Sequence, residues 1–369
     1  MKVGIDAIAF STSKYFLDLN ALAVNRNVDP KKYHVGIGQR KMSIFPPNED
    51  IVTVAIDAAQ KALSSIGDLA SIDMLIFATE SSFDLSKSTG IYVHHFLGLR
   101  EDCRVFDIKQ ACYSATAALR LAQSYVSENP SSKVLVIGSD IVRYSIGTPG
   151  EPTQGGGAVA FIVAQNPRII EIENCAGVHT NNVMDFWRPN YLDEAIFDGK
   201  LSAYSYLKSL DISVNRYFEK TKQSPADIDH VCFHTPFCKL TRKANNQLFR
   251  KNSIEDTLIY NSLIGNSCSA SLYICFISLL DNIKENLARK KIGFFSYGAG
   301  SVSEFFSGII SKNYTKSDFG ASILNDRKEI SFQEYETLYT SKSPIFHLYE
   351  NIGKIKLSKI ENHKRIYIL

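Results

Sequence analysis

The chain has 369 residues, of which 45% are hydrophobic and 21% are charged, and its formal net charge is +3. This composition is typical of a globular protein with room for about two domains, and the weak charge excludes a nucleic-acid-binding protein that relies on a basic surface. The longest apolar run, near residues 270–280, is too short to cross a bilayer, so we expect no membrane segment.

Seven cysteines are spread over the chain without the spacing of a zinc site, and their odd number argues against a complete set of disulfides. Near the N-terminus, Asp6 occupies a position where a signal peptide has its apolar core. We therefore predict a reduced, cytoplasmic protein with no bound metal.

Hydrophobic periodicity predicts strands that alternate with helices. The predicted strands are residues 3–10, 72–78, 134–138 and 158–163, and the predicted helices are residues 16–25, 50–63, 88–97 and 201–222. Glycines 155–157 lead into the last strand, and Ser224-Pro-Ala-Asp227 is typical of a helix start with proline at the first position. The alternation indicates an α/β fold with helices on both faces of a parallel-rich sheet.

The segment 105–122 begins like a strand and becomes a helix rich in small residues. Cys112 lies at the change, where the free N–H groups of the helix start would favour its thiolate. A free cysteine is more often a small buried hydrophobe than a nucleophile, so this pattern alone leaves both interpretations open.

Three segments recur in the same order at an offset of about 156 residues, which indicates two copies of one unit. Residues 72–79 match 228–235, residues 108–115 match 264–271, and residues 134–139 match 292–297. We predict an N-terminal half, residues 1–165, and a C-terminal half, residues 166–369. A pseudo-twofold relation between them would bring Glu80, Cys112, His234 and Asn266 to one site.

Eight short motifs follow one another along the chain. They are Val35-Gly-Ile-Gly-Gln39, Ala78-Thr-Glu80, Lys109-Gln-Ala-Cys-Tyr113, Glu151-Pro-Thr-Gln-Gly155, Asp185-Phe-Trp-Arg-Pro189, His234-Thr-Pro-Phe237, Gly265-Asn266 and Phe295-Ser-Tyr-Gly298. By these motifs and by their order, the chain resembles the bacterial type of 3-hydroxy-3-methylglutaryl-CoA synthase, a family of the thiolase superfamily. The resemblance implies a thiolase-like, duplicated αβαβα layered fold with two pseudo-twofold-related halves.

The resemblance also implies a catalytic trio, Glu80, Cys112 and His234. The family's substrate-contacting positions fall on Asp29, Pro30, Tyr144, Thr153, Ser202, Lys239, Lys243, Asn266 and Ser296. The implied reaction condenses acetyl-CoA with acetoacetyl-CoA and water through an acetyl-Cys112 intermediate, in the mevalonate pathway to isoprenoid precursors. The implied enzyme is a homodimer that uses coenzyme A thioesters as substrates and needs no separate cofactor.

The trio suits this chemistry on general grounds. A thiolate at Cys112 can accept an acetyl group, and a carboxylate at Glu80 can remove a proton from its methyl group. Oxyanions would need donors, for which the backbone N–H groups of Cys112 and Ser296 and the His234 ring are candidates. Asn266 would steer His234 or the second thioester.

The chain departs from the family pattern in the stretch Ser267-Cys-Ser-Ala270, which replaces an aromatic residue and a Thr-Gly pair, and it is shorter around residues 245–257 and near Ser341.

The segment 238–251 carries five basic residues and no acid, so it would bind either CoA phosphates or the acidic helix of an acyl carrier protein. Two alternatives therefore stay open, a β-branching synthase that acts on carrier-bound acetoacetyl groups in polyketide synthesis and a non-catalytic thiolase-fold binding partner. A ketoacyl synthase of the initiating type would share the cysteine, histidine and asparagine but would not need Glu80.

Overall fold

A nine-stranded mixed sheet runs through the molecule in the computed structural model, which describes residues 2–192, 194–250, 253–341 and 349–369. Its order is β11-β12-β13-β8-β1-β7-β6-β4-β5. The strands are β1 (Val3–Ser11), β4 (Ile72–Ala78), β5 (Arg104–Ile108), β6 (Lys133–Val142), β7 (Gly155–Gln165), β8 (Ile170–Thr180), β11 (His230–Phe233), β12 (Lys291–Gly298) and β13 (Val302–Ile310).

The same pairing pattern occurs on both sides of the sheet's centre. On one side β4 is parallel to β6, and β6, β7 and β1 are successively antiparallel. On the other side β11 is parallel to β12, and β12, β13 and β8 are successively antiparallel. The sides join where β1 pairs antiparallel with β8, which is the pairing that a local twofold axis produces. The edge strand β5 is not repeated, because residues 260–264, at the matching offset, belong to helix α7 (Glu255–Ile264).

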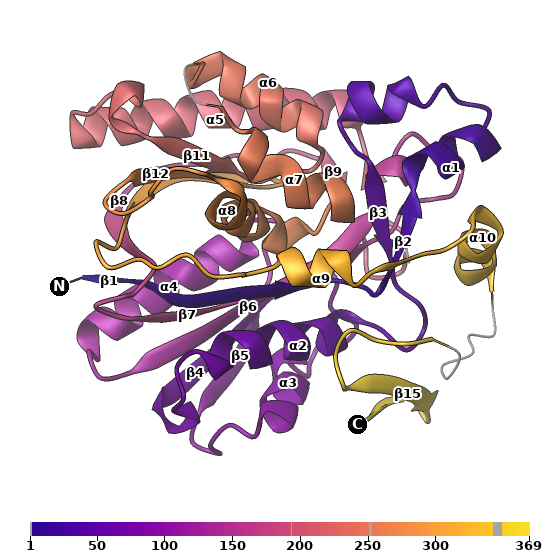
Figure 1. Cartoon of the computed structure of the whole chain (residues 1–369), viewed down its shortest axis with the longest axis horizontal. Coiled ribbons are helices and arrows are strands. Elements are labelled where there is room, and N and C mark those ends of the chain that lie inside the picture. Colours follow the sequence, from indigo (N-terminus) through magenta and orange to yellow (C-terminus); the bar gives the residue numbers. More distant parts are fainter. Residues whose placement is uncertain (1, 193, 251–252, 342–348) are drawn as a thin grey trace.

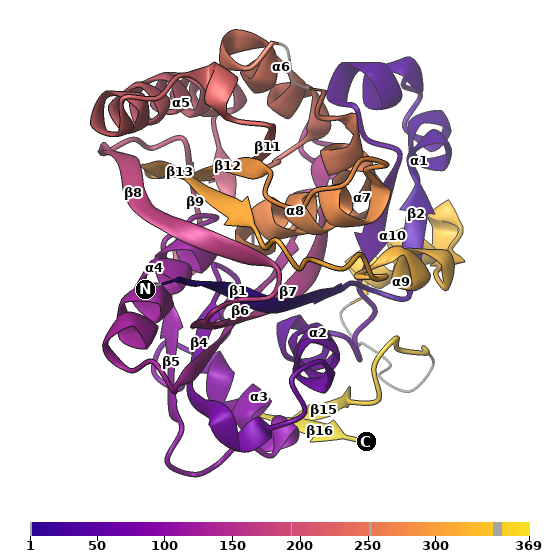
Figure 2. The ribbon, with the colours of Figure 1, turned by 60° about the vertical axis from the view of Figure 1, so that its left-hand side comes forward.

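The helices form three layers, one outside each half of the sheet and one between the halves, as Figures 1 and 2 show. Helices α2 (Ile51–Ser64) and α3 (Thr89–Leu97) pack outside the N-terminal strands, while α5 (Gly199–Thr221) and α6 (Cys238–Leu248) pack outside the C-terminal strands. Helices α4 (Ser114–Glu128) and α8 (Ser271–Asn282) lie between the two sides, and α7 packs against α8. The result is an αβαβα arrangement of five layers.

The middle layer contains the largest part of the core. Small residues of α4 such as Ala118 and Ala122 are fully buried beside the large side chains of α8, among them Tyr273 and Phe276. Tyr273 also packs on Phe161 of β7, with ring centroids 4.7 Å apart. Burial of each large apolar side chain contributes about 1.5–3 kcal/mol, so this layer fixes the starts of α4 and α8 firmly.

Shorter elements complete the molecule. A three-stranded sheet contains β14 (Lys328–Glu329), β2 (Tyr15–Asp18) and β3 (Lys41–Ile44), and two hairpins pair β9 (Phe186–Trp187) with β10 (Ile196–Phe197) and β15 (Lys356–Glu361) with β16 (Lys364–Ile368). The remaining helices are α1 (Leu19–Asn25), a π-helix (Lys32–Ile37), α9 (Ala321–Asn325) and α10 (Phe332–Thr340). Among the described residues, no helix combines the length and apolarity that a membrane span requires.

Several sequence predictions need correction at their boundaries. The predicted helix 16–25 is wrong in its first part, because residues 15–18 pair with β3 as strand β2, and Asp18 then caps α1 by accepting the Asn20 N–H. Strand β7 already begins at Gly155, and the predicted helix at 201 begins at Gly199, where Asp198 caps α5. The Ser224 motif forms a single 3₁₀ turn, residues 225–227.

Candidate active site

Cys112 lies in a tight turn between β5 and α4. The Ser114 hydroxyl accepts a hydrogen bond from the Gln110 N–H and donates one to the Ala111 carbonyl, both at 2.7 Å. Gly298 of β12 packs directly against this turn, since a Cβ there would lie 2.5 Å from the Gln110 carbonyl oxygen. The turn that presents the thiol is therefore held from both sides.

Glu80 follows strand β4 and points at two thiols. Cys112 Sγ donates to Glu80 Oε2 at 3.7 Å, and Cys268 Sγ donates to Glu80 Oε1 at 3.0 Å. Cys268 is buried at the start of the short 3₁₀ turn that leads into α8. Both cysteines thus share one carboxylate, although they come from different halves of the chain.

Asp140, a fully buried residue of β6, fixes the segments on either side of this cluster. Its Oδ1 accepts from the Glu80 N–H at 2.8 Å and from the Thr79 hydroxyl at 2.8 Å, and its Oδ2 accepts from the Ser269 N–H at 3.0 Å. Asp140 therefore ties the loop that carries Glu80 to the turn that carries Cys268.

His234 follows β11, and its orientation is set by Ser271. His234 Nδ1 lies 2.8 Å from Ser271 Oγ, which also accepts the Thr235 N–H at 2.9 Å. Among the described hydrogen bonds the Ser271 hydroxyl has no other acceptor for its proton, so we assign that proton to Nδ1, which leaves the ring proton on Nε2. Burial lowers the pKa of His234 to about 3, so the ring is neutral at physiological pH.

A cavity of about 280 Å³ brings six of the predicted site residues together. They are Cys112, Tyr144, Thr153, Ser202, His234 and Asn266. Much of the remaining wall is apolar and comes from α6 and the β9–β10 hairpin, including Leu240, Phe186 and Phe197. Such a cavity with a few polar groups at one end suits an acyl chain with a reactive carbonyl.

Asn266 lines the cavity together with His234 and makes two hydrogen bonds to its walls. Its Oδ1 accepts the Cys268 N–H at 2.9 Å, and its own backbone N–H donates to the Thr153 carbonyl at 3.2 Å. Gly265 makes this approach possible, because its φ of +81° and its missing Cβ let the chain pass against the Gln154 carbonyl. Asn266 therefore links two parts of the cavity wall.

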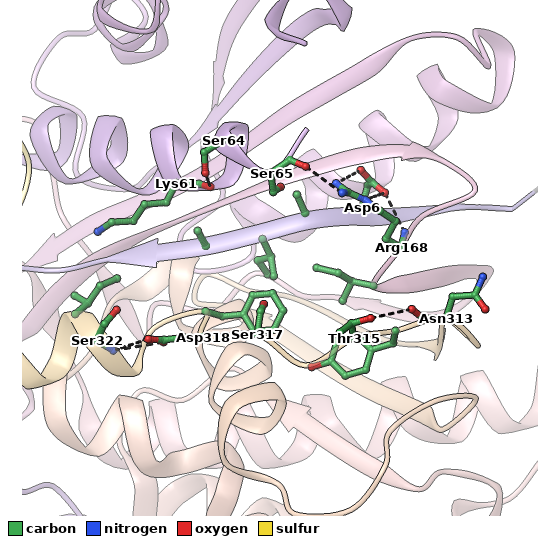
Figure 3. A pocket seen from close by; sticks show the side chains of 17 residues that line it. Asp6, Lys61, Ser64, Ser65, Arg168, Asn313, Thr315, Ser317, Asp318 and Ser322 are labelled. Carbon is green, nitrogen blue, oxygen red and sulfur yellow. Dashed lines mark hydrogen bonds and ion pairs between the residues drawn. The ribbon is translucent and has the colours of Figure 1, made fainter. Parts of the chain in front are cut away.

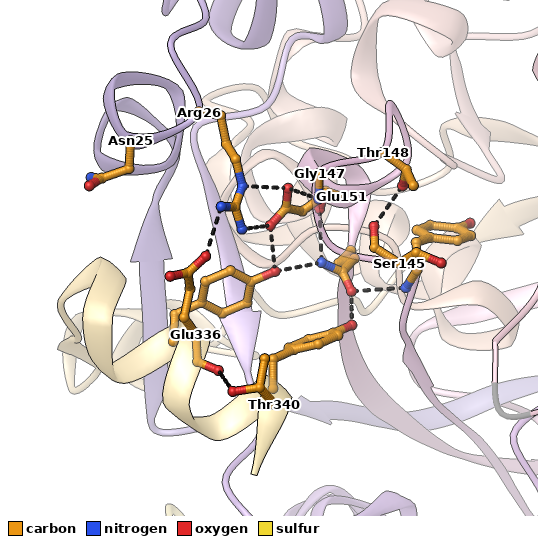
Figure 4. A network of polar contacts seen from close by, with 12 residues as sticks. Asn25, Arg26, Ser145, Gly147, Thr148, Glu151, Glu336 and Thr340 are labelled. Atoms are coloured by element: carbon orange, nitrogen blue, oxygen red, sulfur yellow. Dashed lines mark hydrogen bonds and ion pairs between the residues drawn. The ribbon is translucent and has the colours of Figure 1, made fainter.

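A polar network behind the cavity holds the Glu151-Pro-Thr-Gln-Gly155 motif in place (Figure 4). Arg26, the C-cap residue of α1, donates to both Glu151 oxygens, at 2.9 and 3.0 Å, and to Glu336 of α10 at 2.7 Å. Gln154 Oε1 accepts the Tyr144 N–H at 2.9 Å. The network thereby positions Tyr144, which lines the cavity.

The other predicted contact residues do not line this cavity. Asp29 and Pro30 precede the π-helix, Lys239 and Lys243 are exposed on α6, and Ser296 is buried in β12. Part of the charge of the basic segment 238–251 is neutralised within the chain, because Arg242 is paired with Glu255 of α7. Lys251 lies outside the described residues.

The expectation that the helix start favours a Cys112 thiolate is wrong for this structure. A hydrogen bond with Cys268 lowers the pKa of Cys112, but burial and the negative charges of Glu80 and Asp140 outweigh it and raise the pKa to about 12. Burial, followed by the Asp140 charge, also raises the pKa of Glu80 to about 7. Burial and the neighbouring carboxyl groups therefore keep the thiols of Cys112 and Cys268 in the protonated state at rest.

Three residues of the site were missed by the sequence analysis, namely Asp140, Cys268 and Ser271. Two of the three carry a signal in the sequence. Asp140 is an acid within an otherwise apolar strand, and Cys268 occupies the position that matches Cys112 in the internal repeat. No local pattern singles out Ser271 as the partner of His234.

A larger cavity, of about 580 Å³, lies along β1 between α2 and the segment 313–323 (Figure 3). Its most prominent ion pair joins Arg168 to Asp6, at 2.7 Å. The described residues that line it include neither a cysteine nor a histidine. It therefore lacks a nucleophile–base arrangement of the kind found at Cys112.

Known proteins match the chain over its whole length. Residues 1–167 match the family model for the N-terminal part of hydroxymethylglutaryl-coenzyme A synthase, and residues 170–257 and 246–360 match the model for its C-terminal part. The hydroxymethylglutaryl-CoA synthase of Enterococcus faecalis is 39% identical over 100% of both chains. A polyketide-biosynthesis 3-hydroxy-3-methylglutaryl-ACP synthase of Bacillus subtilis is 32% identical over 92% of this chain and 88% of its own.

Among solved structures, an HMG-CoA synthase complexed with CoA superposes with a TM-score of 0.95 at 37% identity, over 100% of this chain and 99% of the other. This match confirms the predicted layered α/β fold.

Proposed function

Because the chain belongs to the hydroxymethylglutaryl-CoA synthase family, we propose that Cys112, Glu80 and His234 divide between them the condensation that the family catalyses. The chain is a hydroxymethylglutaryl-CoA synthase, an acyltransferase that acts on CoA thioesters. The contact of Glu80 with Cys112 is the observation on which this assignment rests.

Cys112 accepts the acetyl group. Its Sγ attacks the thioester carbon of acetyl-CoA, the carbon–sulfur bond to CoA breaks, and the proton of the resting Cys112 thiol ends on the departing CoA thiol. The turn held by Ser114 and Gly298 presents Sγ to the cavity without further rearrangement.

Glu80 and His234 act in the carbon–carbon bond-forming step. Glu80 removes a proton from the methyl group of acetyl-Cys112, and the resulting carbanion attacks the ketone carbon of the acetoacetyl group. His234 donates Nε2–H to the ketone oxygen as negative charge develops on it. Water then hydrolyses the thioester to Cys112 and releases the six-carbon product.

The site favours delivery of the acetoacetyl group as its CoA thioester. Lys239 and Lys243 are exposed on α6, the helix that also contributes Leu240 to the cavity wall. Ammonium groups beside a cavity mouth suit the phosphates of CoA. The similarity to the polyketide-biosynthesis synthase keeps an acyl carrier protein as the second candidate donor. We place the reaction in the cytoplasm and in the mevalonate pathway as part of the same proposal.

We expect acetoacetyl-CoA and acetyl-CoA to yield free thiol and hydroxymethylglutaryl-CoA at least as efficiently as acetoacetyl-carrier protein does. Replacing Lys239 and Lys243 together by Glu should raise KM for acetoacetyl-CoA by roughly tenfold and change kcat much less, because the contacts bind ground and transition states equally. Lys364→Glu, on the exposed hairpin strand β16, is the control. A carrier-bound substrate turned over at least tenfold more efficiently, with an advantage abolished by salt, would contradict the choice of CoA.

We further propose that two chains form a homodimer through strand β5. This strand is the edge of the nine-stranded sheet, and within the described part of the chain one row of its backbone N–H and C=O groups has no neighbouring strand. Apolar side chains stand exposed around it, with Ile91 40%, Phe106 36% and Leu121 52% accessible on α3, β5 and α4. An antiparallel pair of β5 strands across a twofold axis would cover both features.

Light scattering at micromolar concentration should give twice the 41.2 kDa chain mass. Leu121→Asp should reduce this to the monomer mass, because it places a charge in the proposed interface. Val24→Asp, at an exposed position of α1 far along the chain from β5, should leave the dimer intact. A wild-type monomer, or a dimer unaffected by Leu121→Asp, would refute this interface. We also propose that the predicted halves, residues 1–165 and 166–369, are the two repeated units of each chain.

A further inference from the structure

Three atoms that suit a soft divalent cation lie together beside the cavity, whose wall includes two of the residues that carry them, Cys112 and Cys268. Glu80 offers a carboxylate oxygen, Cys112 and Cys268 offer sulfurs, and these ligand atoms all lie within 4.8 Å of one another. We propose that Glu80, Cys112 and Cys268 form a Zn²⁺ site, and that the bound ion blocks acylation of Cys112. The proposal goes beyond the synthase activity and rests on the geometry of the three side chains.

The separations of these atoms are close to those of a tetrahedral zinc site. With Zn–S bonds of about 2.3 Å and a Zn–O bond of about 2.1 Å, tetrahedral angles place sulfur and oxygen about 3.6 Å apart and the two sulfurs about 3.8 Å apart. The observed distances are 3.7 Å from Cys112 Sγ to Glu80 Oε2 and 3.0 Å from Cys268 Sγ to the other oxygen, Oε1, and the ligand atoms all lie within 4.8 Å of one another. Side-chain shifts of a few tenths of an ångström up to about 1 Å therefore suffice to enclose the ion.

The internal repeat explains why two cysteines from distant parts of the chain meet. Cys112 precedes α4 and Cys268 precedes α8, and the two helices lie side by side in the middle layer. The second thiol belongs to the stretch Ser267-Cys-Ser-Ala270, in which the chain departs from the usual family pattern. The Cys268 backbone is fixed, because its N–H donates to Asn266 Oδ1.

The surroundings of the cluster favour a cation. Asp140 is buried beside it and binds the backbone N–H groups of Glu80 and Ser269, so the segments that carry two of the ligands are held in place before an ion arrives. One cationic group, Arg188, lies close to Glu80 and donates to its backbone carbonyl at 2.7 Å. A divalent cation would balance the two acidic side chains, Glu80 and Asp140, that meet here.

The cavity supplies both access and the fourth ligand. Cys112 and Cys268 line it, so an ion can arrive from solvent, and a water molecule in the cavity can complete four-coordination. On binding, the two thiols release their protons to solvent and become thiolate ligands. Because one sulfur cannot hold both an acetyl group and the ion, Zn²⁺ and acetyl-CoA should compete for Cys112.

Zinc binding to the metal-stripped full chain, measured by competition with a chromophoric chelator, tests the proposal without any substrate. We expect one equivalent of Zn²⁺ per chain, and Co²⁺ should give thiolate-to-cobalt charge-transfer absorption. Cys268→Ser should weaken Zn²⁺ binding at least 100-fold. Cys112→Ala should weaken it as much, and this second variant disturbs the fold less because Cys112 is less buried than Cys268. Cys175→Ser removes a thiol on β8, outside the cluster, and should leave affinity unchanged.

Circular dichroism of each variant establishes that it is folded. Wild-type affinity retained in both Cys268→Ser and Cys112→Ala would overturn the site, as would a wild-type chain that takes up no equivalent of Zn²⁺. Because the readout is metal binding alone, these outcomes are independent of whether the proposed catalytic roles are correct.

Discussion

Cys112→Ala should abolish the covalent intermediate. Brief exposure of the wild-type protein to acetyl-CoA should add one acetyl group, visible in the intact mass, because the turn before α4 presents the Cys112 thiol to the cavity. The variant should show no adduct and should lose synthase activity by on the order of 10⁴-fold or more, because the nucleophile is gone.

The other cysteines provide the control for this experiment. Cys175→Ser should acquire the same single acetyl group as the wild type, since Cys175 lies on β8 and not on the cavity wall. An acetyl adduct that persists in Cys112→Ala would assign the nucleophile to another residue, and Cys268, on the same wall, would be the first to examine.

Glu80→Ala should separate acyl transfer from condensation. The negative charge of Glu80 is one of the causes that raise the pKa of Cys112, after burial, so its removal makes the thiolate easier to form. Acetylation of Cys112 should therefore persist in the variant. Condensation should fall by about 10² or more, because the carboxylate that removes the methyl proton is gone.

The size-matched variant Glu80→Gln tests whether the carboxylate acts as a base or only as a packing group. Glutamine can fill the same space but accepts no proton, so condensation should fall as it does in Glu80→Ala while acetylation is kept. The two steps are followed separately by intact mass and by formation of the six-carbon product. Near-normal product formation in either variant, or loss of acetylation in both, would refute the proposed division of roles.

Much of the architecture was predictable from local patterns. Strand β4 was predicted at its observed bounds, because a short continuous apolar run bounded by polar residues is typical of a strand covered on both faces. The first part of the predicted helix 16–25 failed, because pairing of residues 15–18 with β3 overrode the helical periodicity. The sequence also contained no sign that the second half lacks a counterpart of β5, since that depends on how α7 packs.

By itself, the sequence determined the duplicated α/β organisation and the motifs around Glu80, Cys112 and His234, because these features are encoded in local residue order and in one repeated offset. Only the tertiary structure decided the chemical state of the site. The high pKa of Cys112, the contact between Ser271 and His234, and the cluster of Glu80 with two thiols depend on which side chains packing brings together. Residues 80, 112 and 268 meet because the two halves place the starts of α4 and α8 side by side, and burial there removes the water that would otherwise screen their charges.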